Sequence, residues 1–553
     1  MKLIITSLIS FCLFSTGWLR ADPIISYDYP YPGSFIINHE TSPLMYSGVL
    51  EDSKSLIDYL LVEQQHTDHF IHQHYADFHR ILLALASTRE QTFQTSETPS
   101  QPVEIPVSSD SFVFDVVFDE RHPCGRVFFA REPCLRCDRT FIEIVENRTE
   151  DDRLDHIDYD VLFEGDSEHC IIQWSSNGHY LLLLVEKDDK KQLLRLNPAT
   201  KQETHIQTPG INLDKQGRLC FINHDYGHYI EIENSAAKTT YHLQNDSDEL
   251  DLIMRETIEV MENAEITVLE EQVTATDGTE ISVTIVGLSD VIESLGKHPV
   301  PMVLSVYGGY GRINEPVYNP VYSYLISQGI TVAYAHVRGG GKPDATDQES
   351  REWQNAGQYL NLKTGFQDYI DVAKGLISKR ITASDRLIAT GTSWGGMNAG
   401  YAINQHPTLF AGAVLKVPSV EPRLTMYESD WRYCRVKGMG SVVRGSTVCV
   451  YESFNNYRPT PETMLLEEEL VYNISPYENI RKGSYPHLLV TTGLKDVNVS
   501  PWEPARYHNK LKRFSESGNH LFLYSEMEGD HFFRSDRQNA FEVLFVLDIL
   551  DKL

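Results

Sequence analysis

The chain has far fewer basic than acidic side chains. Its 553 residues include 48 Lys and Arg against 78 Asp and Glu, which gives a formal net charge of −30. This charge repels a phosphate backbone, so we do not expect nucleic acid as a partner. The same charge would either attract cationic substrates or serve only solubility, and solubility is the simpler explanation.

The sequence after residue 21 lacks any apolar stretch long enough to span a bilayer. The amino terminus differs, because basic Lys2 is followed by a mostly apolar run over residues 3–18 and by small Ala21. This pattern is typical of a secretory signal peptide over residues 1–21. We therefore expect a secreted or periplasmic protein with no stable membrane span after cleavage. A retained amino-terminal anchor is the alternative.

Cysteine is scarce, with eight residues in the whole chain. Without Cys12 of the expected signal peptide seven remain, an odd number that cannot all pair. Cys434 and Cys449 lie close together in a polar insert and are the best candidates for a disulfide. Cys134 and Cys137 form a Cys-x-x-Cys motif, typical of a redox pair or half of a zinc site. No second such motif accompanies it, so we expect a disulfide or free thiols there and no metal.

The rest of the sequence divides into three regions with different periodicities. Apolar residues at a spacing of three to four predict a helix over residues 53–86, within an amino-terminal extension of residues 22–110. Short apolar strands between polar turns predict an all-β domain over residues 111–255. Residues 172–200 have the pattern of one propeller-type blade, although a β-sandwich would look much the same.

Strands alternate with helices over residues 256–553, which we expect to form an α/β domain. The expected strands are residues 281–286, 301–307, 331–336, 386–389, 411–417, 486–492 and 520–524. This alternation predicts a largely parallel, doubly wound sheet that is covered by helices on both faces. Reactive groups in such sheets gather at the carboxyl ends of the strands.

A Gly-x-Ser-x-Gly motif surrounds Ser393. It lies between the expected strand 386–389 and a helix that opens near Met397. A serine on a sharp strand-to-helix turn has its hydroxyl pushed out of the sheet, and glycines are needed where side chains would clash. The free N–H groups of the helix can stabilise a developing negative charge. Because the bare motif often arises by chance, the flanking strand and helix carry the prediction of a nucleophile elbow.

A serine nucleophile needs a base and a carboxylate that orients the base. Asp496 and His531 follow two later strands directly, in the chain order that α/β-hydrolases use. His487 and His520 lie at strand starts, on the wrong edge of the sheet. Asp530 adjoins His531, and neighbours on a loop rarely point at each other. Asp496 and His531 are therefore the predicted partners of the serine.

Longer runs surround these residues. They are residues 306–311 (Val-Tyr-Gly-Gly-Tyr-Gly), 336–341 (His-Val-Arg-Gly-Gly-Gly), the elbow with 402–407, 475–479 (Ser-Pro-Tyr-Glu-Asn), 485–496 and 502–505. Across about residues 270–550 the chain resembles the prolyl oligopeptidase family of serine peptidases, and within it the oligopeptidase B branch most. The resemblance implies an α/β-hydrolase fold, a peptide substrate and no cofactor. The expected helix 53–86 resembles the segment that embraces the catalytic domain in that family.

The resemblance also implies roles for individual residues. Ser393, Asp496 and His531 match the catalytic triad. The Tyr307 hydroxyl matches the group that completes the oxyanion hole with the backbone N–H of Trp394. Taken by itself, Tyr307 would be read as a buried aromatic residue in a glycine-rich turn.

The regions that select substrate depart from the family pattern. Tyr310 matches an aromatic residue of the specificity pocket, but Asn498 occupies the position of the arginine that holds substrate in prolyl-specific members. The paired glutamates that select Arg or Lys have no clean counterpart, because the segment 427–469 is rewritten. Candidate carboxylates for a basic side chain are Glu428, Asp430 and residues 467–469. A solvated acidic helix face is the simpler explanation of residues 467–469.

The β-rich region is also shorter than the resemblance implies. Family members carry a seven-bladed propeller, and one blade takes about 40–45 residues. Residues 111–250 have space for about three or four blades, so we expect a truncated or reorganised propeller-like domain.

We therefore expect a serine-type endopeptidase or oligopeptidase that acts through an acyl-enzyme, with cleavage after basic residues as the candidate specificity. An α/β-hydrolase esterase and a catalytically silent binding protein on the same fold are the alternatives. The sequence leaves the oligomeric state open.

Overall fold

The fold is described from a computed structural model. It describes residues 53–86, 264–343, 345–422, 461–496 and 498–553, together with strands and short turns between residues 89 and 261. The expected signal peptide, the Cys134–Cys137 motif and the insert with Cys434 and Cys449 lie outside the described residues. Within the described part of the chain, no helix has both the length and the apolar character needed to cross a bilayer.

An eight-stranded sheet forms the centre of the carboxy-terminal domain, in the order β13-β14-β16-β15-β17-β18-β19-β20. The strands are β13 (Ile266–Thr274), β14 (Glu280–Leu288), β15 (Met302–Val306), β16 (Thr331–Ala335), β17 (Leu387–Thr392), β18 (Gly412–Lys416), β19 (His487–Gly493) and β20 (Leu521–Glu526). Neighbours from β16 to β20 are parallel, and β13, β14 and β16 pair antiparallel. The predicted α/β fold with a largely parallel sheet is confirmed. The polar edge strand β13 was not predicted.

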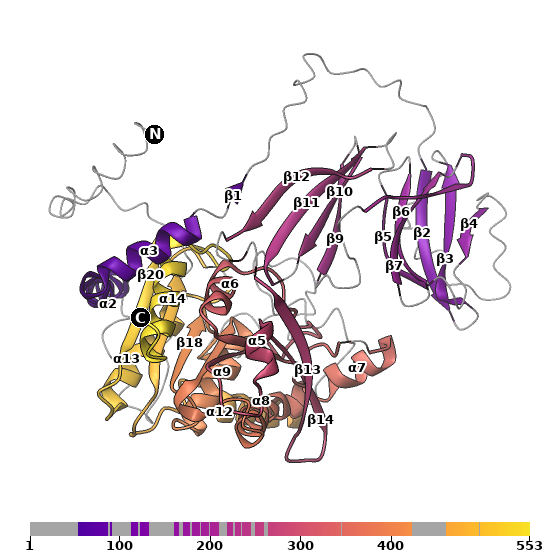
Figure 1. Ribbon diagram of the computed structural model, residues 1–553. Coiled ribbons are helices and arrows are strands. Elements are labelled where there is room, and N and C mark those ends of the chain that lie inside the picture. Colours follow the sequence, from indigo (N-terminus) through magenta and orange to yellow (C-terminus); the bar gives the residue numbers. More distant parts are fainter. Residues whose placement is uncertain are drawn as a thin grey trace. The chain divides into compact units, whose positions relative to one another are not determined.

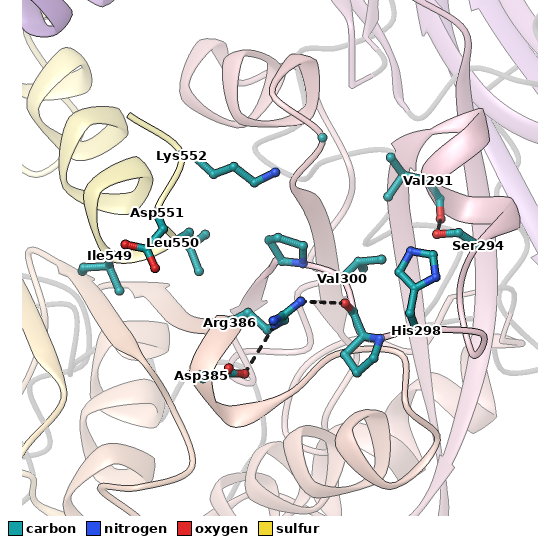
Figure 2. Close-up of a pocket in the computed structure, with 13 residues that line it drawn as sticks. Val291, Ser294, His298, Val300, Asp385, Arg386, Ile549, Leu550, Asp551 and Lys552 are labelled. Carbon is teal, nitrogen blue, oxygen red and sulfur yellow. Dashed lines mark hydrogen bonds and ion pairs between the residues drawn. The ribbon is translucent and has the colours of Figure 1, made fainter.

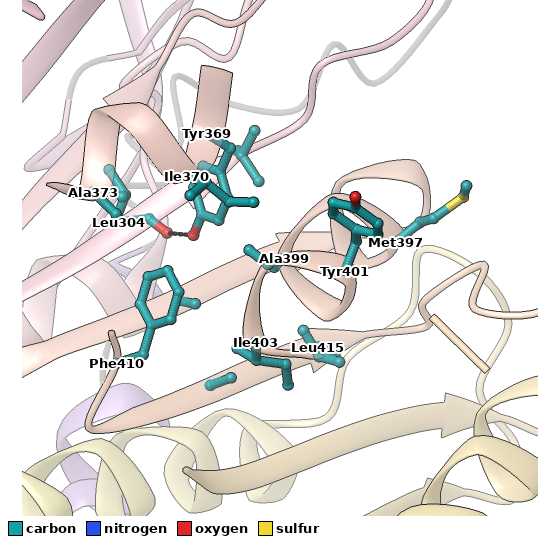
Figure 3. Close-up of a cluster of buried hydrophobic side chains, with 14 of the residues drawn as sticks. Leu304, Tyr369, Ile370, Ala373, Met397, Ala399, Tyr401, Ile403, Phe410 and Leu415 are labelled. Carbon is teal, nitrogen blue, oxygen red and sulfur yellow. Dashed lines mark hydrogen bonds between the residues drawn. The ribbon is translucent and has the colours of Figure 1, made fainter. Parts of the chain in front are cut away.

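Helices cover both faces of this sheet because strand side chains alternate between two apolar cores. The helices are α5 (Ser289–Glu293), α6 (Pro320–Ser327), α7 (Asp347–Asn355), α8 (Leu362–Ser378), α9 (Trp394–Gln405), α12 (Pro461–Ile474), α13 (Trp502–Phe514) and α14 (Asp536–Ile549). Leu304 faces the core that α8 and α9 cover, and Val303 faces the core under α6 and α14. In the first core, Tyr369 of α8 donates a hydrogen bond to the Leu304 carbonyl at 2.8 Å (Figure 3).

Two amino-terminal helices pack on the same domain. They are α2 (Ser53–Gln73) and α3 (Tyr75–Ala86), so the single helix predicted over residues 53–86 is interrupted at His74. Figure 1 shows α2 beside β20 and α3 beside α14. Leu60 is buried in the core of α8 and α9, while Ile81 is buried in the core of α14. The helical segment is therefore an integral part of the core of this α/β domain.

Polar contacts anchor α2 to α13. The Tyr59 hydroxyl donates to Nδ1 of His508 at 2.9 Å, and Nε2 of His508 donates to the Leu521 carbonyl at 3.1 Å. Burial lowers the pKa of His508 to about 4, so its ring is neutral at pH 7. Lys512 donates to both carboxylate oxygens of the buried Glu63, at 2.9 and 3.0 Å.

The described strands between residues 89 and 257 form three antiparallel sheets. The first sheet contains β2 (Phe112–Asp119), β3 (His122–Arg131) and β4 (Asp160–Glu164), and the second contains β5 (Cys170–Ser176), β6 (Leu181–Lys187), β7 (Lys190–Asn197) and β8 (Gln202–His205). The third sheet contains β9 (Arg218–His224), β10 (Gly227–Glu233), β11 (Ala237–Gln244), β12 (Asp251–Thr257) and β1 (Arg89–Glu90). The second sheet contains residues 172–200, for which one propeller-type blade was predicted. The closure of these sheets into a propeller stays a prediction.

Candidate active site

Ser393 occupies a sharp turn between β17 and α9. Its backbone has φ 57° and ψ −117°, a conformation that non-glycine residues rarely adopt. A Cβ at Gly391 would lie 2.1 Å from the Gly395 carbonyl oxygen, and one at Gly395 would lie 2.1 Å from the Val306 oxygen. Any larger residue at either position would clash with the backbone, so both must be glycine. The strand, turn and helix of the predicted nucleophile elbow are present.

The segment after β18 supports the elbow from behind. The Ser393 N–H donates to the Lys416 carbonyl at 2.9 Å, and the Ser419 N–H donates to the Ser393 carbonyl at 3.1 Å. Val417, between them, has φ 39°, which is strained for a β-branched residue. Sequence reasoning missed this support, since nothing in the residue types around Val417 indicates a positive φ.

Asp496 and His531 form a buried hydrogen-bonded pair. Nδ1 of His531 donates to Oδ2 of Asp496 at 2.7 Å. The other oxygen, Oδ1, accepts hydrogen bonds from the backbone N–H groups of Asn498 and Val499, both at 2.8 Å. The carboxylate is fully buried and fixed on both sides, so it holds the imidazole with Nε2 available for chemistry.

The three predicted triad residues follow strands of one parallel set. Ser393, Asp496 and His531 come after the carboxyl ends of β17, β19 and β20, which therefore reach the same edge of the sheet. The Lys495 N–H donates to the Gly529 carbonyl at 2.9 Å and joins the last two loops. Among the described residues, no direct hydrogen bond joins Ser393 to His531. Such bonds are often long without substrate and shorten in the complex.

The loop after β15 brings Tyr307 to the elbow. Nδ2 of Asn398, on α9, donates to the Tyr307 carbonyl at 3.4 Å, and Nε1 of Trp394 donates to the Gly308 carbonyl at 3.1 Å. Burial raises the pKa of the Tyr307 phenol above its usual value, despite the nearby Arg312. The hydroxyl thus stays protonated and can donate to an oxyanion. The role of Tyr307 in the oxyanion hole stays a prediction.

Aromatic rings pack against one another beside the elbow. The Tyr310 ring lies edge-on to the Trp394 ring at 5.8 Å between centroids, and 6.4 Å from the Tyr307 ring. Tyr310 is 40% exposed, so part of the residue is accessible to solvent. Asn498 is exposed on the loop that carries Asp496. The substrate-binding roles of Tyr310 and Asn498 stay predictions.

An arginine clamp stabilises the loop that supports Tyr307. Arg338 donates from Nε and Nη2 to the two oxygens of the buried Asp368, at 2.9 and 2.6 Å, and from Nη1 to Asp277 at 2.7 Å. The following glycines pack on the Tyr307 loop, where the Gly311 N–H donates to the Gly339 carbonyl at 3.1 Å. The sequence places Arg338 in a glycine-rich run, but it does not indicate the acidic partners, which lie 30 and 61 residues away.

The candidate carboxylates for a basic substrate are described only in part. Glu428 and Asp430 lie outside the described residues, and of the run 467–469 only the side chain of Glu469 is described, as exposed. No group of three or more His, Cys, Asp or Glu residues that could hold a metal ion occurs in the described part.

A cavity of about 470 Å³ lies at the opposite edge of the sheet (Figure 2). Its lining includes Pro301, Gly329 and Arg386, which precede the amino ends of β15, β16 and β17. Nη1 of Arg386 is bound to the Pro299 carbonyl at 3.1 Å. The cavity is therefore separate from the loops that carry Ser393 and His531.

Curated proteins are similar to about half of the chain. Protease 2 of Moraxella lacunata is 29% identical over 288 residues, which are 51% of this chain and 38% of the relative. Dipeptidyl aminopeptidase BI of Pseudoxanthomonas mexicana is 28% identical over 332 residues, 59% of this chain and 42% of the relative. The chain thus spans about two fifths of the length of these curated relatives.

Solved structures have a similar fold. Oligopeptidase B from Leishmania major has a TM-score of 0.58 at 20% identity, over 80% of this chain and 57% of that one. Oligopeptidase B from Trypanosoma brucei with covalently bound antipain has a TM-score of 0.56 at 22% identity, over 80% and 59%. At this identity they support the α/β-hydrolase fold alone.

A family model matches the carboxy-terminal part of the chain. The model of the prolyl oligopeptidase family matches residues 317–553, which contain Ser393, Asp496 and His531 but begin after Tyr307. Residues 317–553 of this chain are therefore similar to the prolyl oligopeptidase family.

Proposed function

We propose that this protein is a serine peptidase that hydrolyses peptide bonds through an acyl-enzyme. The observation that carries the proposal is the His531–Asp496 hydrogen bond of 2.7 Å at the sheet edge where the strained Ser393 turn lies. The match of residues 317–553 to the prolyl oligopeptidase family model supports the same reaction class. No step of this chemistry requires a metal or an organic cofactor.

The first half-reaction forms the acyl-enzyme. Nε2 of His531 takes the hydroxyl proton of Ser393 while its oxygen attacks the substrate carbonyl carbon. The negative charge on the carbonyl oxygen is stabilised by the Tyr307 hydroxyl and the backbone N–H of Trp394, at the amino end of α9. Asp496 stabilises the imidazolium that forms. His531 then delivers its proton to the leaving amine as the C–N bond breaks.

The second half-reaction restores the enzyme. His531 takes a proton from a water molecule, which attacks the ester carbonyl of the acyl-enzyme. The same two donors bind the second oxyanion. The bond to the Ser393 oxygen breaks, and His531 returns the proton to the serine.

Cleavage after Arg or Lys is the specificity we propose. The net charge of −30 favours cationic peptides as they approach. Acidic residues of the segment 427–469 are candidates for binding the basic side chain. Cleavage-site profiling with a peptide library tests this, and a preference for Pro before the cleaved bond would contradict it.

We also propose that the protein is exported. The basic residue, apolar run and small residue within residues 1–21 support a signal peptide. Amino-terminal sequencing of the protein recovered outside the cytoplasm should begin at Asp22. A first residue of Met1 would contradict signal cleavage.

An esterase with the same triad is the second candidate, since nothing in the triad geometry separates it from a peptidase. Matched ester and amide substrates with the same acyl group distinguish the two. A peptidase should hydrolyse the amide with a kcat/KM that Ser393→Ala abolishes. Ester hydrolysis with no Ser393-dependent amide hydrolysis would favour the esterase.

A further inference from the structure

Two consecutive phenylalanines follow His531 and point into solvent. Phe532 is 80% exposed and Phe533 is 49% exposed. Most aromatic rings of the described domain are buried, because burial removes apolar surface from water. Two exposed phenylalanines beside the proposed catalytic histidine are therefore unusual in this domain.

Hydrogen bonds on both sides fix this loop. The Asp530 carboxylate accepts from the backbone N–H groups of Phe532 and Phe533, both at 2.8 Å. The Arg534 guanidinium donates to the carbonyl of His531 at 3.1 Å and to that of Phe533 at 2.7 Å. The two rings are thus presented by an ordered turn that is anchored to the same residues as the imidazole.

The Phe532 ring lies directly against the imidazole of His531. Their centroids are 5.2 Å apart and the planes are perpendicular. Because Nδ1 of His531 is bound to Asp496, Nε2 is the nitrogen that serves the reaction. In the proposed mechanism Nε2 gives its proton to the leaving amine, so the first residue after the cleaved bond must lie beside this ring. The Phe532 ring contacts this same imidazole.

We propose that Phe532 selects an apolar side chain in the first residue on the leaving-group side of the cleaved bond. This inference rests on the proposed peptidase function. Asp530 adds a second element of selection, because its carboxylate is held on the same turn by the backbone N–H groups of Phe532 and Phe533. An acidic residue at the same substrate position should be disfavoured by this charge.

The test uses the full protein and internally quenched peptides that differ only in the residue after the cleaved bond, which is Phe, Leu, Ser or Asp. The methyl ester of the same acyl peptide has a leaving group without a side chain. For the unmodified protein, kcat/KM should be about tenfold higher for Phe and Leu than for Ser. Phe532→Ala should lower it about tenfold for Phe and Leu, and change it less than twofold for Ser and the ester.

Two further variants control for effects on folding and on His531. Phe532→Leu keeps an apolar contact and should retain part of the preference, while Phe533→Ala is the matched control and should leave the ratio unchanged. An equal loss on all substrates, ester included, would mean that Phe532 only positions His531 and would overturn the proposal. An unchanged preference in Phe532→Ala would also overturn it. No Ser393-dependent hydrolysis of any substrate would instead contradict the proposed function, and this inference with it.

Discussion

Single side chains carry the proposed chemistry, and each is fixed by a contact that can be removed. One oxygen of the Asp496 carboxylate accepts a hydrogen bond from His531, and the other accepts hydrogen bonds from two backbone N–H groups. The backbone bonds hold the side chain in place, and the bond to His531 orients the base. These two roles can be separated by substitution.

Asp496→Asn should lower kcat by about 10³- to 10⁴-fold, because the amide cannot both stabilise the imidazolium and hold Nδ1–H as donor. Its oxygen can still accept from Asn498 and Val499, so the fold should persist. Steady-state kinetics with a thermal melt of each protein measures both. A loss below tenfold would show that another group orients His531.

Tyr307→Phe removes one oxyanion donor and keeps the ring. We expect kcat to fall about 10²- to 10³-fold with little change in KM, because the bond forms mainly in the transition state. In the unmodified protein, ionisation of this phenol should not reduce activity below about pH 10, since burial raises its pKa. A pH–rate profile of both proteins checks this, and an unchanged kcat would exclude Tyr307 from the oxyanion hole.

Loops and helices hold these side chains at the carboxyl edge of the sheet. The Arg338 clamp on Asp368 and Asp277 stabilises the glycine loop that packs against the Tyr307 loop. Burial raises the pKa of Asp368, and Arg338 opposes that shift. Loss of Arg338 would leave a buried carboxyl group without its cation.

Arg338→Met should therefore lower the free energy of unfolding by about 3–5 kcal/mol. The control is Lys379→Met, which breaks a more exposed pair with Glu271 and should cost no more than about 1 kcal/mol. Urea denaturation at pH 7 measures both variants. Equal small losses would show that the clamp does not stabilise the loop.

Sequence reasoning located elements whose residues have a local signature. The strands of the parallel sheet were predicted to within a few residues, because they are short apolar runs, and the elbow was predicted from its glycines. The helix 53–86 was predicted as one piece, since periodicity does not register the interruption at His74. The Arg338–Asp368 clamp and the positive φ of Val417 depend on tertiary contacts, which no local pattern encodes.

Along the chain, the molecule contains two amino-terminal helices, then the antiparallel β-sheets, and then the α/β domain. Two buried neutral histidines belong to this assembly: His508, bound by Tyr59 of α2, and His336, bound by Thr284 at 2.8 Å. Burial lowers the pKa of each to about 4. In the unfolded chain both histidines would be protonated below about pH 6.5, whereas in the folded protein they become protonated only near pH 4.

The unfolded state thus holds more protons between pH 6.5 and 4, so stability should fall as the pH decreases through this window. The slope is about 1.4 kcal/mol per pH unit for each histidine. Urea unfolding from pH 7 to 4 measures it. His508→Gln keeps an acceptor for Tyr59 but does not titrate. It should therefore reduce the slope by the contribution of one histidine, about 1.4 kcal/mol per pH unit. The same slope in both proteins would contradict the role of His508.

The central claim is that Ser393 is an activated nucleophile, and a fluorophosphonate probe tests it most directly. The full protein should be labelled stoichiometrically, with the adduct on the peptide that contains Ser393 in mass spectrometry. Ser393→Ala should show no labelling, and Asp496→Asn should be labelled much more slowly. Undiminished labelling of Ser393→Ala, or no labelling of the unmodified protein, would contradict the claim.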